Sequence, residues 1–288
     1  MVNSTILTDE GRPVAGRLLI AVVAGERGIG TSVSAALLAL AASARTTTLC
    51  IDASGRRASF RWRNPPRPNG AGRPDDNPAW LPGMLGTVTG TLDVISTHHE
   101  SDSDDVKQMD IPVERLAPVA DDYDTVIVDA GTGVKTLASA CRLGHGAGAE
   151  VRFLVAAAPG GAGLAAAHAA IKGVRQAGIH TPATLLMPAS DEASAITAHG
   201  LLDGAATRFL SERIDYAGPM TRDACLATAL RGGMPLADAA AGGGAIAAAF
   251  EVLERLSLAQ AANYSEVWPK LAHQEKAPQT LNSAKLAG

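Results

Sequence analysis

Aromatic side chains are scarce in this 288-residue chain, where phenylalanine, tryptophan and tyrosine together make up only 3% of the residues. Apolar residues nevertheless account for 47%, so a core must be built mainly from alanine, valine, leucine and isoleucine. The length is sufficient for one large α/β domain or two small ones, with a core of substantial size.

Cysteine and long apolar runs are also scarce. Cys50, Cys141 and Cys225 lie far apart, and without a CxxC pair or a cysteine–histidine cluster they exclude zinc and redox motifs. The most apolar stretch, Ala239–Phe250, is too short to span a membrane and contains three glycines. The polar start of the chain, Met1–Pro13, lacks a signal-peptide pattern. We therefore expect a cytoplasmic protein with buried, reduced thiols.

An excess of positive charge is missing too, since the formal net charge is −4 and the pI is about 6.0. This balance gives no general electrostatic reason to bind nucleic acid or an anionic membrane. The segment 56–80 is rich in arginine, proline and glycine, and we expect a mobile, solvated loop there. The predicted organisation is a flexible segment 1–16, one domain 17–260 and a polar tail 261–288, which shows no basic amphipathic helix.

The first part of the domain reads as a β–α–β unit. Arg17–Ala24 is a continuous apolar run, Gly25–Gly30 is a glycine-rich turn, and Thr31–Ala44 is an apolar helix. A β-branched, apolar strand over Thr46–Ile51 then stops at Asp52. Continuous rather than alternating hydrophobicity predicts parallel strands that are covered on both faces.

Strands and helices continue to alternate along the rest of the chain. Together they predict an α/β fold: a doubly wound, mostly parallel sheet with helices on both faces. The further strands are expected at Leu92–Ser96, Tyr123–Val128, Val151–Ala157, Ala183–Met187 and Ile214–Ala217, and the further helices at 164–176, 190–213, 224–231 and 245–258.

The glycine turn is expected to bind phosphate, because backbone N–H groups and the positive end of a helix dipole converge there. Two interpretations fit. A dinucleotide fingerprint would use Gly28 and Gly30, with Asp52 as the ribose-binding acid, but Val33 replaces its third glycine. A P-loop would use Gly25, Gly30 and Ser32, with Thr31 in the lysine position.

The turn resembles the deviant P-loop KGGxGK[ST] of the MinD/ParA family of ATPases. Gly28, Ile29, Gly30 and Ser32 match that pattern. Three residues depart from it: Glu26 replaces the first lysine, Arg27 replaces a glycine, and Thr31 replaces the second lysine.

Further segments are similar to the flagellar-number regulators of that family, the FlhG/FleN type. Asp52-Ala53-Ser54 stands where the family has DxD, and residues 123–133, YDTVIVDAGTG, resemble its YDxxIIDTGAG. Residues 153–172 and the order DYAG, ALR, MPL in the last third also resemble this branch. The resemblance covers about residues 18–258, and the stretch 55–118 matches poorly.

The resemblance implies a single-domain P-loop fold and a regulator of flagellar number or placement. It implies contacts with an SRP-type GTPase and basal-body components, and a homodimer that encloses ATP. ATP or ADP would lie on Gly25–Ser32, with Mg²⁺ held by Ser32, Asp52 and Asp129. Ser54 occupies the position of the lost catalytic aspartate, so no catalytic residue is assigned. Nucleotide binding should be weakened or lost, with little or no hydrolysis. We expect no nucleic acid binding, and inner-membrane association only through partners.

Two departures keep alternatives open. Met187-Pro188 stands where the family reads adenine with asparagine, and the motif that engages the GTPase is missing from Met1–Gly16. The first alternative is an accessory protein of cellulose synthesis or pilus assembly, whose relatives tolerate threonine at the position of Thr31. A more distant alternative is a Rossmann-type oxidoreductase. It would need a tyrosine followed by lysine four residues later, which Tyr123, Tyr216 and Tyr264 all lack.

Overall fold

Eight strands form one sheet in the order β10-β9-β8-β1-β7-β2-β4-β3. The computed structural model describes residues 17–54, 85–99, 109–110, 112–188, 190–220, 223–241 and 243–261. All neighbouring strands are parallel except β3 and β4, which are antiparallel. The strands are β1 (Leu18–Ala24), β2 (Thr48–Asp52), β3 (Gly86–Thr89), β4 (Leu92–Ser96), β7 (Thr125–Asp129), β8 (Glu150–Ala156), β9 (Ala183–Pro188) and β10 (Asp215–Met220). A separate antiparallel pair joins β5 (His98–His99) to β6 (Met109–Asp110).

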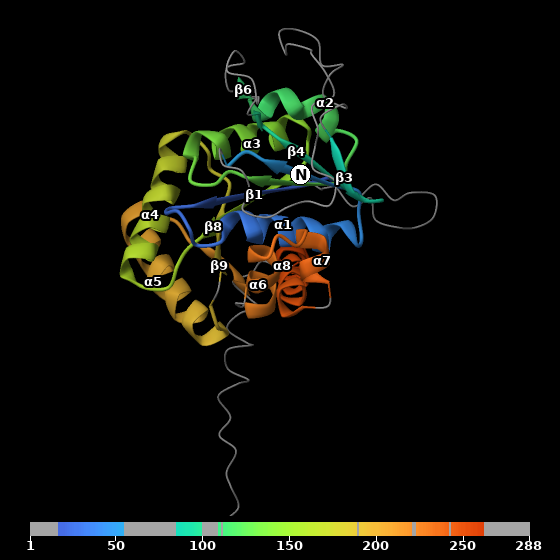
Figure 1. Ribbon diagram of the computed structural model, residues 1–288. Helices are drawn as coiled ribbons and strands as arrows, with labels where there is room; N and C mark the ends of the chain where they lie inside the picture. Colours follow the sequence, from blue (N-terminus) through green and yellow to red (C-terminus); the bar gives the residue numbers. More distant parts are fainter. Residues whose placement is uncertain are drawn as a thin grey trace, which may run out of the picture.

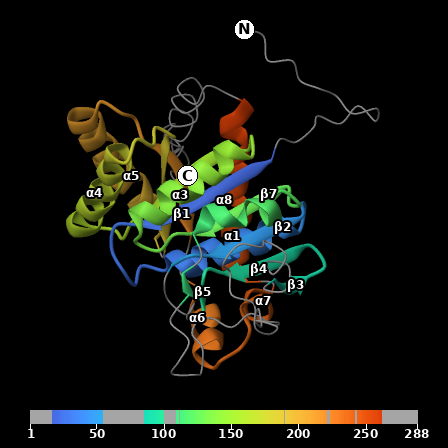
Figure 2. The ribbon, with the colours of Figure 1, turned by 90° about the horizontal axis from the view of Figure 1, so that it is seen from above.

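Helices cover both faces of this sheet. Figure 1 shows α1 and α8 on one face and α3 on the other. Viewed from above in Figure 2, α4 and α5 lie side by side. The helical segments are α1 (Thr31–Ser43), the 3-10 turn η2 (Val113–Leu116), α2 (Ala117–Ala120), α3 (Val134–Gly146), α4 (Gly161–Gln176), α5 (Glu192–Leu210), α6 (Ala224–Arg231), α7 (Leu236–Ala240) and α8 (Gly244–Ala261).

Strand β1 shows why the apolar runs are continuous. Leu19, Ala21 and Val23 point into the core beneath α3, α4 and α5, whereas Ile20 and Val22 point into the core shared with α1 and α8. All five side chains are essentially inaccessible to solvent. A strand covered on both faces has no polar side, so its sequence cannot alternate.

The predicted fold class is confirmed, with adjustments at the element boundaries. Strand β2 begins at Thr48 rather than Thr46, and α5 spans 192–210 rather than 190–213. The sequence interpretation missed α3, whose buried Leu137, Ala140, Cys141 and Gly144 follow helical spacing. The predicted segments 1–16 and 56–80, and the tail beyond Ala261, lie outside the described residues.

The strand order does not support the dinucleotide-binding alternative. In that fold the second strand lies directly beside the first, which brings the ribose-binding acid next to the glycine turn. Here β7 separates β1 from β2 and pairs with both. Asp52 is therefore a whole strand further from the turn than a dinucleotide site requires. Within the described residues, no helix combines the length and apolarity needed to cross a membrane.

Candidate phosphate-binding site

The turn between β1 and α1 has a backbone that requires glycine at two positions. Gly28 has φ of 81° and Gly30 has φ of 98°, a region that side chains rarely tolerate. Gly30 is the N-cap of α1, and its carbonyl accepts a 2.9 Å hydrogen bond from the Ser34 N–H. No side chain caps the helix, and its first turn has no acidic residue. The N-terminus of α1 is therefore suited to an anion.

Close packing fixes this turn against two other elements. A Cβ atom on Gly25 would overlap the carbonyl group of Ala166 in α4 and lie 2.6 Å from the Ala167 nitrogen. A Cβ atom on Gly30 would lie 3.7 Å from Cβ of Pro188, the last residue of β9. Met187-Pro188, which stands where the family reads adenine with asparagine, therefore ends beside the predicted phosphate site. The sequence interpretation did not anticipate the contact with α4, which the alanine run 165–167 makes sterically feasible.

Asp129 stands at the centre of the site because β7 lies between β1 and β2. The Gly131 N–H donates a 3.0 Å hydrogen bond to Oδ1 of its carboxylate, and the Ser32 side chain lies close enough to lower the pKa of this carboxyl group. The carbonyl of Gly131 in turn accepts a 2.7 Å bond from Ala24 at the end of β1. The structure thus brings together Ser32 and Asp129, two of the three predicted magnesium ligands.

The third predicted ligand, Asp52, is the register partner of Asp129 on the adjacent strand. Burial of the Asp129 carboxyl raises its pKa from 3.8 to about 6. The hydrogen bonds from Ser32 and Gly131 lower the pKa, whereas the charge of Asp52 raises it further. A cation between these carboxylates would relieve that repulsion.

Ser54 lies at the edge of the same site. Its hydroxyl donates a 2.8 Å hydrogen bond to Oδ1 of Asp52, and its backbone N–H donates to the same atom at 3.2 Å. A Cβ atom on Gly131 would lie 3.1 Å from Ser54, so the two segments are in close contact. A hydroxyl group is a poor general base compared with a carboxylate, and the Asp52–Ser54 segment contains no carboxyl group besides that of Asp52.

Positive charge is missing where a triphosphate would need it. Glu26 is half-buried in the turn, Arg27 is exposed, and Thr31 is 8% exposed at the first position of α1. Lys135 is exposed in the first turn of α3, after the Gly131–Gly133 segment. The turn and the start of α1 offer backbone donors, the Arg27 guanidinium and the hydroxyls of Thr31 and Ser32, but no ammonium group.

The donor set fits magnesium bound together with phosphate better than a metal held by protein alone. Within the described residues, no group of three or more histidine, cysteine, aspartate or glutamate side chains is placed to bind a metal. Magnesium commonly takes one or two carboxylates and completes its shell with water and phosphate oxygens. Ser32, Asp52 and Asp129 meet that requirement.

No protein-family profile matches the sequence, and no curated protein matches it. Solved structures match its fold. The ParA-family ATPase from Chlorobium tepidum TLS is 16% identical with a TM-score of 0.54, over 84% of this chain and 98% of that one. MinD from Pyrococcus horikoshii OT3, complexed with Mg-ADP, is 14% identical with a TM-score of 0.56, over 83% and 96%. MinD in the MinC:MinD complex from Aquifex aeolicus is 15% identical with a TM-score of 0.55, over 83% and 95%.

The described part of the chain therefore has the fold of the MinD/ParA-type P-loop ATPases. The match spans nearly the whole length of each of these structures.

Proposed function

We propose that this chain is a MinD/ParA-like regulator of flagellar number or placement that acts through protein partners. Its ATP binding is weakened or lost, and it hydrolyses little or no ATP. The observation that carries the proposal is the pairing of Asp52 with Asp129 at the ends of adjacent strands, beside an uncapped, glycine-built helix N-terminus. In this arrangement the backbone N–H groups of the glycine turn and the N-terminus of α1 remain available to a phosphate group.

In this proposal each group has a separate role. Backbone N–H groups of Gly28–Thr31 would hold the phosphates of ATP or ADP, and Ser32 with Asp129 and Asp52 would hold Mg²⁺. The bound metal ion would neutralise phosphate charge. The chain's own residues would only orient the phosphates, because neither Ser54 nor Thr31 can activate water or stabilise developing negative charge.

A role through partners agrees with the likeness to MinD, which was solved in complex with MinC. For this chain we propose an SRP-type GTPase and basal-body components as the partners. We also propose a homodimer across the nucleotide face. The resemblance of residues 123–133 and of the order DYAG, ALR, MPL to flagellar-number regulators supports this branch of the fold.

Calorimetry with ATP and Mg²⁺ on the purified full-length chain tests the nucleotide site. We expect weak, magnesium-dependent binding that Asp129→Ala abolishes. Asp121→Ala should leave the binding unchanged, because Asp121 is an exposed acid in the turn before β7. Deletion of the gene in its native bacterium tests the flagellar role, and we expect an altered number or placement of flagella.

The second candidate is an accessory protein of cellulose synthesis or pilus assembly. Thr31 at the lysine position does not exclude it, because such relatives tolerate this replacement. Neighbouring genes discriminate between the two candidates. A deletion strain with normal flagella that has lost cellulose or pili would support the second candidate and contradict the first.

A further inference from the structure

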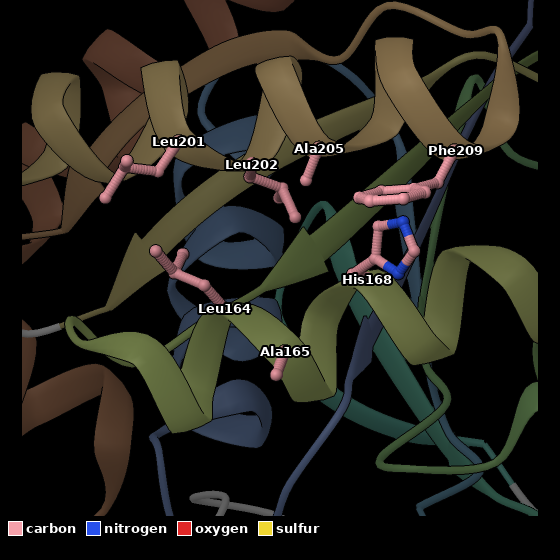
Figure 3. Close-up of a pocket in the computed structure, with 7 residues that line it drawn as sticks. All are labelled: Leu164, Ala165, His168, Leu201, Leu202, Ala205 and Phe209. Carbon is pink, nitrogen blue, oxygen red and sulfur yellow. The ribbon is translucent and has the colours of Figure 1, made fainter.

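A hollow of about 250 Å³ lies between α4 and α5, away from the phosphate site. Figure 3 shows its walls, with side chains from α4 facing side chains from α5. Apart from His168, its lining is apolar and consists of Leu164, Ala165, Leu201, Ala205 and Phe209, with Leu202 at the base. Hollows of this composition on a protein surface are suited to binding apolar side chains.

The α5 wall is unusual because it exposes large apolar groups. Leu201 is 63% exposed and Phe209 is 67% exposed, whereas small Ala205 lies between them. These residues are spaced four apart, so they form one ridge along α5 with a notch at its centre. The ridge spans roughly 12 Å, or about two turns of a helix packed along it.

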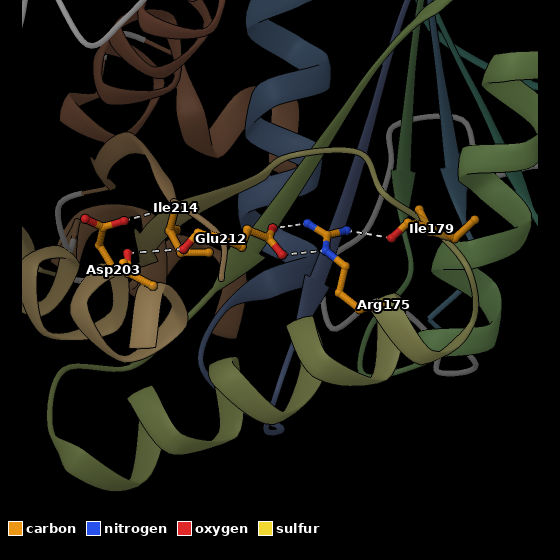
Figure 4. Close-up of polar contacts among 6 residues, drawn as sticks. Arg175, Ile179, Asp203, Glu212 and Ile214 are labelled. Carbon is orange, nitrogen blue, oxygen red and sulfur yellow. Dashed lines mark hydrogen bonds and ion pairs between the residues drawn. The ribbon is translucent and has the colours of Figure 1, made fainter. Parts of the chain in front are cut away.

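The two helices that form the hollow are joined firmly at their C-terminal ends. Arg175 of α4 forms a two-pronged ion pair with Glu212, which follows α5, and both side chains are only 16% exposed. Arg175 also donates a 2.6 Å hydrogen bond to the Ile179 carbonyl, as Figure 4 shows. In addition, Asp203 of α5 accepts a 2.9 Å bond from the Ile214 N–H. The hollow is therefore preformed, which lowers the entropy cost of binding.

Positive groups border the hollow, and the acids of its two helices are engaged elsewhere. The Arg208 guanidinium lies 5.3 Å from the centre of the Phe209 ring, and exposed Lys172 follows His168 by one turn of α4. Helix α4 has no acidic residue. The two acids of α5 are both engaged elsewhere, Glu192 with Arg255 and Asp203 with Arg213. Nε2 of His168 is buried without a hydrogen-bond partner in the described part of the chain.

We propose that the α4–α5 hollow binds an amphipathic helix of another protein, with apolar residues on one face and acidic residues beside them. The apolar residues would occupy the notch at Ala205 between Leu201 and Phe209. Acidic residues would pair with Arg208 and Lys172. The length of the ridge matches the i, i+4, i+7 anchors of a helix that binds in a groove.

Charge and shape argue against other occupants. A second copy of the chain on the same face would bring Arg208 and Lys172 of one copy against those of the other, which costs energy. A flat membrane surface would contact only the ridge of Leu201 and Phe209 and would leave the depression lined by Leu164, Ala165 and Ala205 unfilled. Net charge of −4 also disfavours an anionic bilayer.

The test uses the full-length protein and two synthetic helical peptides. Both have leucine at positions i, i+4 and i+7, with glutamate at the flanking positions of one peptide and lysine at those of the other. Fluorescence anisotropy should show the glutamate peptide binding about tenfold more tightly. Leu201→Ser and Phe209→Ser should each weaken it about tenfold or more. Ile196→Ser, on the same helix and 41% exposed but outside the hollow, should leave binding unchanged. Arg208→Glu should reverse the preference.

Several results would overturn the proposal. They are equal binding of both peptides, no binding of either, or a loss of peptide affinity in Ile196→Ser equal to that in Leu201→Ser and Phe209→Ser. Self-association that Leu201→Ser abolishes would instead assign the hollow to a second copy. Pelleting with phosphatidylglycerol vesicles that Phe209→Ser abolishes would assign it to lipid. Peptide binding that appears only after removal of residues 262–288 would assign it to the chain's own tail. None of these results depends on whether the phosphate site binds ATP.

Discussion

Asp52 and Asp129 are register partners at the carboxyl ends of the adjacent parallel strands β2 and β7. Burial raises the pKa of the Asp129 carboxyl to about 6, and the charge of Asp52 adds to this effect. Such a pair is costly to keep ionised without a cation. The pair therefore lowers the free energy of unfolding, and this effect can be measured in the absence of any ligand.

The first prediction concerns pH. Because the Asp129 pKa is near 6 in the folded state and near 3.8 in the unfolded state, the folded protein holds the extra proton between these values. The contribution of Asp129 to the free energy of unfolding should therefore fall as the pH rises from about 4 to 6. Asp129→Asn should remove this dependence and stabilise the protein by roughly 1–3 kcal/mol at pH 7. Urea unfolding across this pH range measures both effects.

A matched control for this measurement is Asp121→Asn, because Asp121 is an exposed acid paired with Arg17 at the surface. It should leave the slope between pH 4 and 6 unchanged. If Asp129→Asn destabilises the protein at pH 7, or the slope persists in that variant, the assignment of the titration to Asp129 is wrong.

The second prediction separates two glycines of the same turn. Gly25→Ala places a methyl group against the backbone of Ala166 in α4, where no side chain can move aside. We expect a loss of roughly 2–4 kcal/mol in the free energy of unfolding. Gly28→Ala meets no atom within 4 Å and is penalised only by its φ of 81°. It should cost about 1 kcal/mol. Thermal unfolding compares the two, and equal losses would refute the contact with α4.

The third prediction is that steady-state ATPase activity is absent or marginal. Ser54 donates its hydroxyl to Asp52 and cannot act as a carboxylate base, and the turn lacks lysine. Phosphate release at saturating ATP and Mg²⁺ should not exceed that of Asp129→Ala. Turnover comparable with that of intact MinD-type ATPases, if Asp129→Ala abolishes it, would show that another group supplies the chemistry.

The fourth prediction is restoration of binding. Gly28 and Gly30 already have the required backbone conformation, so Glu26→Lys with Thr31→Lys should add roughly 3–6 kcal/mol of phosphate contact. This corresponds to about two to four decades of ATP affinity. Calorimetry on the wild type, both single variants and the double variant measures the gain. Because exposed Arg27 could obstruct a partner subunit, Arg27→Gly is added to the double variant. No gain in any folded variant would mean that the turn is not a phosphate site.

The sequence predicted the sheet and the glycine turn because both leave local patterns. Buried parallel strands require continuous apolar runs such as 18–24, and the turn requires glycine at positions 28 and 30. Helix α3 was missed although its buried residues follow helical spacing, because Gly144 and Gly146 have low helix propensity. Gly144 is needed there, since a Cβ atom would lie 2.6 Å from the Val151 side chain.

The parts of the site that depend on tertiary contacts could not be predicted in this way. No local pattern shows that β7 lies between β1 and β2, although this order places Asp129 beside Ser32. The contact of Pro188 with the turn joins residues more than a hundred positions apart in the chain. The hollow between α4 and α5 could not be predicted for a similar reason. In the sequence alone, Leu201 and Phe209 cannot be distinguished from core residues, although both are exposed.

The backbone contact between Gly25 and Ala166 has a mechanical consequence. Ala166 adjoins Ala165, which lines the α4–α5 hollow, whereas Gly25 opens the turn that would hold phosphate. Two backbones in direct contact cannot absorb a displacement by side-chain rotation, so a shift of the turn must be transmitted to α4. The Arg175–Glu212 ion pair holds the far end of α4 in place. Both ends of α4 are therefore held, one by the turn and the other by this ion pair.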